Sequence, residues 1–442
     1  MAKVSNYAEY LDILGSEYQT VKQEYLKRVV DEELNIALKY AGAVLIEGPK
    51  WCGKTRTAEE RAASVLYLQD IRKNKFYAHT LDNSPADLLE GETPRLIDEW
   101  QTAPILWNGV RFEVDQRCEP GQFILTGSAV LLDTRGLHTG TGRFARIFMR
   151  PMSLFESQES NGSVSLASLF NGDKIKGTSA LTIRDLAYVL VRGGWPDSIG
   201  KEEKLALRYA RDYVDSVING DISRVDGVER NPERVSRLMR SLARNVSTMA
   251  NMKTINNDVT GKDNTDIANE KTIASYINAL KQIFVIEDLP AWSPDMRSKT
   301  ALRTSSKRHF VDPSVAAAVL KLSPDGLLKD FNMFGLLFES LCIRDLRIYA
   351  QSMEGELHHF HDKNGLEVDA IVSLYDKQWG AFEIKMGGKE EDKAAENLLK
   401  LKDKVNTDEM GSPSFLAILT ATEDAYLRRD GVYVIPLGCL RN

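Results

Sequence analysis

The sequence predicts an α/β protein with a parallel-sheet domain, a helical region and a second α/β domain. Three observations support this fold class. A strand-like apolar run, a glycine-rich loop and a helix-forming segment follow one another over residues 43–63, and further short apolar runs come after them, as in parallel sheets. Residues 163–219 have a mainly helical pattern and further helical segments follow, and strand-like segments joined by Asn364 and Gly365 return near the C-terminus.

Length and composition indicate a multidomain globular protein. The 442 residues exceed what one hydrophobic core organises, and roughly 100–200 residues per domain suggest two to four domains. A content of 43% hydrophobic and 27% charged residues argues against a disordered chain. The net charge of −6 argues against a wholly basic nucleic-acid binder and leaves a local basic surface open.

The sequence also predicts a compartment. Its 4 cysteines are scattered without a CxxC pair, which fits a reducing environment and gives no zinc site. No apolar run approaches the ~20 residues that a membrane-spanning helix needs. Residues 1–12 carry acidic side chains instead of the basic and then apolar segments of a secretion signal. We therefore expect a cytoplasmic protein without membrane contact.

The glycine-rich loop has the pattern of a phosphate-binding loop. Residues 48–55 read GPKWCGKT, which fits GxxxxGKT between a strand and a helix. Gly48 and Gly53 let the backbone turn N–H groups around an anion, and the following helix adds the positive end of its dipole. We expect Lys54 to contact the β- and γ-phosphates of ATP and Thr55 to bind Mg²⁺. The other expected nucleotide-binding residues are Pro49, Lys50, Trp51, Cys52 and Arg56.

Acidic and hydroxyl residues end the next strand-like runs. Residues 95–97 lead into Asp98 and Glu99, an apolar strand followed by two acids, as in a Walker B motif. We expect Asp98 to belong to the Mg²⁺ shell and Glu99 to orient or polarise the attacking water. Another apolar run ends in Thr126, which we expect to hydrogen-bond the γ-phosphate or that water, with Ser128 as the alternative.

Arginine residues precede a fifth strand-like run at residues 147–149. Arg143, or alternatively Arg146, is expected to neutralise charge in the transition state, either within the chain or across a subunit boundary. A structural role at the surface is the competing interpretation. An arginine that acts across a boundary would require an oligomer, which the sequence leaves open.

Together the segments GPKWCGKT, LIDEWQTAP, FILTGSA, GTGRFARIFMRPMSLFE and RGGWPDS resemble the AAA-type ATPase family whose members carry a C-terminal domain named DUF4143. The resemblance covers most of the chain and implies an AAA+-like P-loop domain, a winged helix and a nuclease-like C-terminal domain. Seven residues match motif positions of the P-loop domain: Gly48, Gly53, Lys54, Thr55, Asp98, Glu99 and Thr126.

The middle of the chain reads as helices followed by a small β-ribbon. Asn231 is a good N-cap for one helix, and residues 272–284 form a second amphipathic helix. Strand-like pieces at residues 285–286 and 307–311 follow, an order that suggests a winged helix, as the resemblance implies. The polar residues 256–265 are expected to form a loop.

A stripe of arginines marks the first of these helices. Its members recur at three- and four-residue spacing: Arg234, Arg237, Arg240 and Arg244. Such a stripe fits contact with nucleic-acid phosphates, or a solvated face interleaved with acids. The second helix carries little net positive charge, which weakens the case for direct DNA reading.

Four charged residues in the last third of the chain form another pattern. Glu339 lies in a helix-like segment, Asp369 lies in an apolar strand, and Glu383 and Lys385 share one face of the next strand. This is the layout of PD-(D/E)xK nucleases, which the DUF4143 resemblance also implies. Buried carboxylates this close are costly without a cation.

We therefore expect Asp369 and Glu383 to bind Mg²⁺ or Mn²⁺, with Glu339 supporting them. Lys385 would steady the scissile phosphate or the attacking water. A scaffold of this kind that has lost catalysis is the alternative.

Histidines precede the predicted hairpin. If Asn364 and Gly365 form a two-residue turn, Phe360 faces Asp369 across the ladder, and His358 shares that face. These histidines would then lie near the metal, or they are ordinary edge-strand residues.

The predicted domains are a P-loop domain with an N-terminal helix (1–160), a helical lid or connector (161–225), a winged-helix-like domain (226–328) and a nuclease-like domain (329–442). The sequence thus predicts a protein that binds ATP or ADP and is coupled to a nuclease-like domain acting on nucleic acid. The alternative is an ATP-driven switch that binds a protein or DNA partner and cuts nothing.

Overall fold

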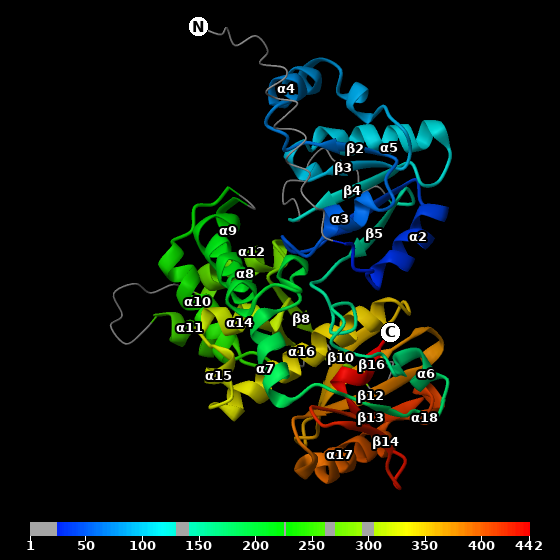
Figure 1. Cartoon of the computed structure of the whole chain (residues 1–442), viewed down its shortest axis with the longest axis vertical. Coiled ribbons are helices and arrows are strands. Elements are labelled where there is room, and N and C mark those ends of the chain that lie inside the picture. Colours follow the sequence, from blue (N-terminus) through cyan, green and yellow to red (C-terminus); the bar gives the residue numbers. More distant parts are fainter. Residues whose placement is uncertain (1–23, 130–140, 225–226, 261–269, 294–304) are drawn as a thin grey trace, which may run out of the picture.

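The computed structural model describes residues 24–129, 141–224, 227–260, 270–293 and 305–442. Figure 1 shows three parts: a P-loop domain (blue to cyan), a helical region (green to yellow) and a second sheet (orange to red). The predicted α/β class with a parallel sheet is confirmed. The acidic segment at residues 1–12 and Gly140 lie outside the described residues.

The first sheet has five parallel strands in the order β2-β3-β4-β1-β5. They are β1 (Ala43–Glu47), β2 (Ser64–Tyr67), β3 (Arg95–Asp98), β4 (Phe123–Gly127) and β5 (Phe144–Phe148). The central strands are apolar runs because both faces of the sheet are covered. Since β4 lies between β1 and β3, its C-terminal end lies between the phosphate-binding loop and Asp98.

Helices cover both faces of this sheet. They are α2 (Val30–Tyr40), α3 (Lys54–Glu59), α4 (Asn74–Asn83) and α5 (Ile105–Arg117), with 3₁₀ turns at Pro85–Leu89 and Trp100–Thr102. Leu34 of α2 and Ala58 of α3 pack with Val44 on one face. Trp107 of α5 packs with Leu45 on the other face. Because the phosphate-binding loop follows the end of β1 directly, it lies at the carboxyl edge of the sheet, and α3 packs on the face that carries Val44.

The helical region follows the P-loop domain. It contains α7 (Ile183–Arg192), η3 (Pro196–Ser198), α8 (Glu203–Ser216), the π-helical turn η4 (Val217–Asp221), α9 (Ile222–Arg224), α10 (Pro232–Arg244), α11 (Met252–Thr260), α12 (Glu270–Gln282), α14 (Pro313–Val319) and α15 (Pro324–Leu327). An antiparallel pair, β8 (Ile286–Leu289) and β9 (Lys307–Phe310), lies between α12 and α14. The winged helix itself stays a prediction.

Two local predictions in this region have different outcomes. The Asn231 side chain caps α10 by accepting hydrogen bonds from the backbone of Glu233 and Arg234, as its residue type predicts. The predicted loop at residues 256–265 is wrong for residues 256–260, which belong to α11. Ile255 and Val259 are buried, and this four-residue spacing of apolar side chains outweighs the polar composition. Residues 261–265 lie outside the described part of the chain.

The C-terminal part is a seven-stranded mixed sheet in the order β10-β11-β12-β13-β15-β14-β7. Its elements are α16 (Phe331–Gln351), β10 (Glu356–His361), β11 (Glu367–Ser373), β12 (Trp379–Lys385), α17 (Glu391–Lys404), α18 (Thr407–Met410), β13 (Phe415–Thr420), β14 (Asp424–Leu427), β15 (Tyr433–Pro436) and β16 (Leu440–Arg441). Helices α16 and α17 pack on opposite faces. Among the described residues, no helix has the length and apolarity to span a membrane.

The predicted connector is partly built into this sheet. Its strand β6 (Val164–Ser165) pairs with β16, and β7 (Gly177–Thr178) pairs with β14, with α6 (Leu166–Phe170) between them. One hydrophobic core also runs from the helical region through α16 to β13. The predicted boundaries at residues 160, 225 and 328 stay predictions. The segments on either side of them pack together through strand pairs and a common core, which local composition does not signal.

This shared core makes a prediction for fragments. Chain 329–442 alone is expected to lack cooperative unfolding, because it loses β6 and β7 and exposes the side of α16 that packs on the helical region. Fragment 161–442, which keeps these contacts, is the matched control and should unfold cooperatively. Near-ultraviolet circular dichroism during heating measures both. A sharp transition of fragment 329–442 would contradict the shared core.

Candidate functional site

The phosphate-binding loop depends on two glycines. Gly48 and Gly53 have φ angles of 156° and 100°, which side chains rarely allow. A Cβ atom on Gly48 would also lie 2.1 Å from the carbonyl oxygen of Met149. The chain therefore enters and leaves the loop in conformations that fit glycine, and α3 begins directly after Gly53.

The Lys54 side chain folds back over this loop. It is 5% exposed, and its ammonium donates to the carbonyl oxygens of Gly48 (2.9 Å) and Pro49 (2.8 Å). An ammonium has three donors. The Lys54 charge is therefore fixed inside the loop, where an anion would meet it.

A hydroxyl and carboxylate network links the loop to the neighbouring strands. The hydroxyls of Thr55 and Thr126 each donate to Asp98 Oδ1 at 2.7 Å, and the Glu99 backbone N–H donates to Thr126 Oγ1 at 3.0 Å. Thr126 is fully buried. In this network the Thr126 hydroxyl positions the two acids, and its predicted contact with the γ-phosphate or the attacking water stays a prediction.

The oxygens of Thr55 and Asp98 suit Mg²⁺. A hydroxyl and a carboxylate oxygen 2.7 Å apart at the edge of the loop are hard donors of the kind that this cation prefers. Magnesium at a phosphate site uses one or two protein groups, with water and phosphate oxygens as the other ligands. The residues present therefore fit an Mg²⁺ ion bound together with a nucleotide.

Glu99 is held in an unusual conformation. Its φ of 55° lies in the left-handed region, which is uncommon for a non-glycine residue. Ser128 donates to its carboxylate at 2.8 Å, and Gln101 donates to the same oxygen. Ser128, the alternative to Thr126 in the sequence, thus contacts the predicted catalytic acid. Gln101 was not predicted, although it lies only two residues after Glu99.

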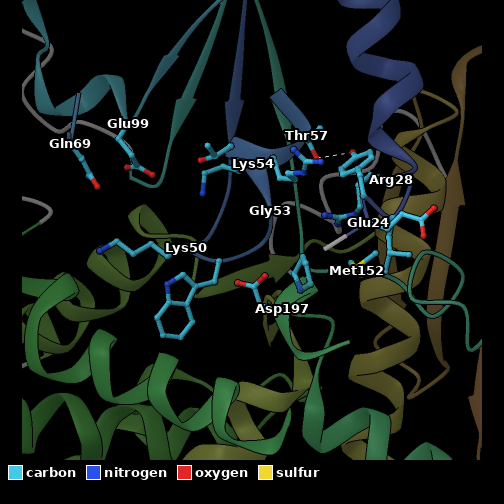
Figure 2. Close-up of a pocket in the computed structure, with 16 residues that line it drawn as sticks. Glu24, Arg28, Lys50, Gly53, Lys54, Thr57, Gln69, Glu99, Met152 and Asp197 are labelled. Carbon is cyan, nitrogen blue, oxygen red and sulfur yellow. Dashed lines mark hydrogen bonds between the residues drawn. The ribbon is translucent and has the colours of Figure 1, made fainter. Parts of the chain in front are cut away.

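Of these residues, Gly53, Lys54, Thr55 and Glu99 line one cavity of about 570 Å³. Figure 2 shows Lys54 and Glu99 on its upper side and Lys50 and Asp197 on its lower side. Tyr25, in the segment before α2, also lines it, and its hydroxyl contacts Thr57 at 3.0 Å. The cavity therefore lies between the P-loop domain and the helical region.

Arg28 fixes the loop from the same N-terminal segment. It is 7% exposed, pairs with Glu156 at 3.0 Å and donates to the carbonyl oxygen of Cys52 at 2.8 Å. No sequence motif indicates Arg28, because its partners Glu156 and Cys52 are far along the chain.

Two predicted nucleotide-binding residues have protein partners. Arg56 pairs with Glu60 at 2.8 Å, and its guanidinium lies 5.9 Å from the ring centre of Tyr25, at the cavity wall. Cys52 is fully buried, and its sulfur contacts the carbonyl oxygen of Met149 at 3.4 Å. This burial supports a packing role for Cys52.

The loop also contacts the helical region. The Lys50 ammonium lies 2.6 Å from a carboxylate oxygen of Asp221, and the ring centres of Trp51 and Tyr213 are 5.9 Å apart. Asp221 belongs to the π-helical turn η4, a rare element that is frequent at functional sites. A second hollow, of about 250 Å³, is lined by Lys50, Asp221 and Glu99.

Arg143 lies at the opposite edge of the sheet from the loop. The next residue, Phe144, pairs with Ala43 at the start of the parallel strand β1, whereas the loop follows Glu47 at its end. Five residues of strand separate the two edges by about 16 Å. Arg143 instead pairs with Asp115 at 2.8 Å. The structure therefore places Arg143 away from the loop of its own chain, and its role in the transition state stays a prediction.

Arg146 is the alternative to Arg143 for the role in the transition state. Its side chain is 53% exposed and pairs with Glu47 at 3.2 Å.

The structure brings the C-terminal acids together around two lysines. The Lys385 ammonium lies 2.6 Å from Glu383 and 3.1 Å from Asp369. Lys307 of β9, which the sequence did not single out, lies 3.0 Å from Glu339 and 3.6 Å from Asp369. The predicted carboxylates thus meet, but with a second ammonium group between them.

Burial dominates the electrostatics of this cluster. Burial, together with the charge of Asp369, raises the pKa of Glu339 to about 8 and that of Glu383 to about 7. Burial would also raise the pKa of Asp369, but Lys385 and Lys307 hold it below its usual value. Among the described residues, no group of three or more His, Cys, Asp or Glu side chains is arranged to hold a metal. The predicted Mg²⁺ or Mn²⁺ at Asp369 and Glu383 is therefore not supported.

The predicted two-residue turn at Asn364 and Gly365 is wrong. His361 pairs with Glu367 and Phe360 pairs with Val368, so Phe360 does not face Asp369. Five residues, 362–366, lie between the paired His361 and Glu367, and the Asp362 carboxylate accepts hydrogen bonds from the backbone N–H groups of residues 364 and 366.

The neighbouring histidines have structural contacts. A ring nitrogen of His359 lies 3.1 Å from the carbonyl oxygen of Ser305, and burial lowers the pKa of this imidazole to about 4. His358 lies 3.4 Å from the Ser373 hydroxyl.

Comparisons with known families match three segments. Residues 40–158 match an AAA domain, residues 183–326 match a domain of unknown function (DUF8612) and residues 334–440 match a domain of unknown function (DUF4143). The second match crosses the predicted boundary at residue 225, in agreement with the shared core.

Similar whole chains also exist. The uncharacterized proteins Rv2008c of Mycobacterium tuberculosis and Mb2031c of Mycobacterium bovis are each 24% identical over 368 residues, which cover 81% of this chain and 74% of theirs. The Walker-type ATPase PABY2304 of Pyrococcus abyssi is 16% identical, with a TM-score of 0.43 and coverage of 68% of this chain and 97% of that chain. The ORC2 protein of Aeropyrum pernix is 10% identical, with a TM-score of 0.29 and coverage of 76% and 94%.

The AAA match contains the whole loop and the acids Asp98 and Glu99, whose geometry is that of a nucleotide site. The DUF4143 match contains α16 and the C-terminal strands β10 to β15. The chain therefore combines a P-loop domain that matches the AAA domain with a C-terminal part that matches DUF4143.

Proposed function

We propose that this protein binds Mg-ATP and hydrolyses it, and that its nucleotide state controls the contact between the P-loop domain and the helical region. One observation carries the proposal: Lys54, Thr55 and Glu99 all line the same cavity between these two parts. Asp98 joins them through its hydrogen bond with Thr55.

Each residue has a defined task in this proposal. Lys54 and the backbone N–H groups of the loop bind the phosphates, and Thr55 and Asp98 hold Mg²⁺. Bound Mg²⁺ supplies positive charge against the β- and γ-phosphate oxygens. Glu99, fixed by Ser128, orients the attacking water and accepts a hydrogen bond from it.

The ion pair between Lys50 and Asp221 connects nucleotide binding to the helical region. Lys50 lies in the loop, so a bound phosphate competes with Asp221 for its ammonium. The Lys50 side chain is 40% exposed, which leaves it free to change partner, whereas Asp221 is largely buried in η4. Binding and release of nucleotide would then alter the packing of η4 against the loop.

Nucleic acid is the second candidate partner, and α10 supports it. The side chains of Arg237, Arg240 and Arg244 are exposed on this helix and are suited to phosphate contacts. Arg237 is paired with Glu233, which lowers the charge of the stripe. We therefore propose that α10 contacts nucleic-acid phosphates without reading the base sequence. This contact would complement the ATP-driven switch, and contact of α10 with a protein partner would do the same.

Replacement of Lys54 by Ala tests the nucleotide site. ATP affinity is expected to fall about 10- to 100-fold, since charge-assisted hydrogen bonds contribute about 1.5–3 kcal/mol. Titration with a fluorescent ATP analogue measures this, with Lys39→Ala on the exposed end of α2 as the matched control. Equal affinities of the Lys54→Ala variant and the wild type would overturn the proposed function.

A further inference from the structure

The C-terminal acids already hold a cation that belongs to the chain. The Lys307 side chain is 3% exposed, and its ammonium lies 3.0 Å from Glu339, 2.8 Å from Glu367 and 3.6 Å from Asp369. Burial alone would lower the pKa of this lysine, but the surrounding carboxylates raise it above its usual value. Lys307 is therefore a charged ammonium group enclosed by carboxylates.

A divalent metal does not fit the same oxygens as they are arranged. One oxygen of Asp369 accepts hydrogen bonds from the Ile384 backbone (2.8 Å) and from Lys385 (3.1 Å), and the other faces Lys307. One oxygen of Glu383 contacts Lys385 at 2.6 Å, and the other accepts from Asn397 at 3.1 Å. All four oxygens that a metal would bind are thus used by the protein.

Two lysines neutralise much of the cluster without a metal. The ammonium groups of Lys307 and Lys385 face the carboxylates of Asp369 and Glu383. Lys307 also faces Glu339 and Glu367, and the Glu367 side chain is 43% exposed to water. Buried charges are tolerated when they are paired in this way, and an added divalent cation would have to displace a lysine.

We infer that Lys307 is the resident cation of the C-terminal carboxylate cluster, so that this domain binds no divalent metal there and does not cleave nucleic acid by a metal-dependent route. Lys307 belongs to the helical region, whereas Glu339, Asp369 and Glu383 belong to the C-terminal part. The cluster is therefore an ionic joint between the two parts. This inference is independent of the proposed ATP hydrolysis and concerns a different site.

The place of Lys307 in the fold supports a role as a joint. Its strand β9 pairs with β8, and Glu287 of β8 contacts Arg150 of the P-loop domain at 2.9 Å. Arg347 of α16 contacts the same Glu287 at 3.2 Å. The β8–β9 hairpin thus contacts all three parts of the chain through buried or half-buried ion pairs.

The test is the response of the full chain to Mn²⁺ without nucleotide. An Asp98→Asn background removes the metal ligand of the P-loop site, so that any remaining binding reports on the rest of the chain. In this background Mn²⁺ is expected to leave the Tm unchanged. When Lys307→Met is introduced into this Asp98→Asn background, the Tm should fall by about 6–20 °C, because buried acids are left unpaired. Mn²⁺ should then restore part of the lost Tm.

Lys281→Met is the matched control. Lys281 also pairs with a carboxylate of the β8–β9 hairpin, Asp288, but its side chain is 37% exposed, so its loss should change the Tm little and should not create a response to Mn²⁺. If Lys307→Met does not fold, Lys307→Arg keeps the charge and is expected to fold and to ignore Mn²⁺.

Three results would overturn the inference. They are stoichiometric Mn²⁺ binding to the Asp98→Asn chain in electron paramagnetic resonance titrations, an unchanged Tm of the Lys307→Met variant, or DNA or RNA cleavage that requires Mg²⁺ or Mn²⁺ and is lost in Lys385→Ala. None of them depends on whether the P-loop site hydrolyses ATP.

Discussion

Replacement of Glu99 by Gln is expected to lower ATP turnover by about 100-fold or more while ATP still binds. The amide keeps the size of the carboxylate and can keep a hydrogen bond to Ser128, so the site retains its shape. It loses the negative charge that orients and polarises water. Steady-state phosphate release measures turnover, and titration with a nucleotide analogue measures binding.

The matched control for this change is Glu92→Gln. Glu92 is exposed and precedes β3, whereas Glu99 follows the same strand and lines the cavity. The control should keep wild-type turnover. If Glu99→Gln hydrolyses ATP at the wild-type rate, Glu99 is not the residue that activates water, and the acid would have to be sought elsewhere around the cavity.

Replacement of Arg344 by Met is expected to destabilise the shared core by about 3–5 kcal/mol. The Arg344 guanidinium lies 2.7 Å from Asp345 and 2.8 Å from Asp312, and these side chains are at most 2% exposed. Asp312 also accepts a hydrogen bond from the backbone of Gly194, and Asp345 accepts one from Leu154. Loss of the arginine leaves two buried acids without their cation, in positions that backbone contacts fix.

An exposed ion pair in the same half of the chain provides the control. Arg184 and Asp325 lie 3.6 Å apart with both side chains 70% exposed, so Arg184→Met should cost less than about 1 kcal/mol. Urea unfolding followed by tryptophan fluorescence measures both variants. Similar stabilities of Arg344→Met and Arg184→Met would show that the buried cluster contributes no more than a surface pair.

Much of the nucleotide site could be predicted because its signals are local. The loop needs two glycines five residues apart and a helix directly after them, so neighbouring residues carry the whole pattern. Residues at the end of an apolar strand can also be recognised in the sequence, and this pattern identified Asp98 and Glu99. The surroundings of Thr126 and Arg143 could not be predicted, because they depend on the order and direction of the strands. That arrangement places Thr126 in contact with Asp98 and Arg143 at the opposite edge of the sheet from the loop.

Long-range contacts account for the residues that the sequence missed. Asp221 lies 171 positions from Lys50, and Lys307 lies 32 positions from Glu339. The sequence around a lysine in a short strand does not show whether its side chain is solvated or is buried among three acidic side chains. Only the packing of β9 against α16 and β11 gives Lys307 its surroundings.

By itself, the sequence determined that the protein has a P-loop site with two acids after a strand, a capped helix at residue 232, and acids and a lysine on C-terminal strands. These features are set by neighbouring residues through backbone conformation and side-chain periodicity. The tertiary structure decided which of them meet and what neutralises them: it joined the predicted connector to the C-terminal sheet and placed Lys307 where a metal ion was predicted. The physical reason is that burial makes unpaired charge costly, and the partner that removes this cost is chosen by packing in space, which local sequence does not encode.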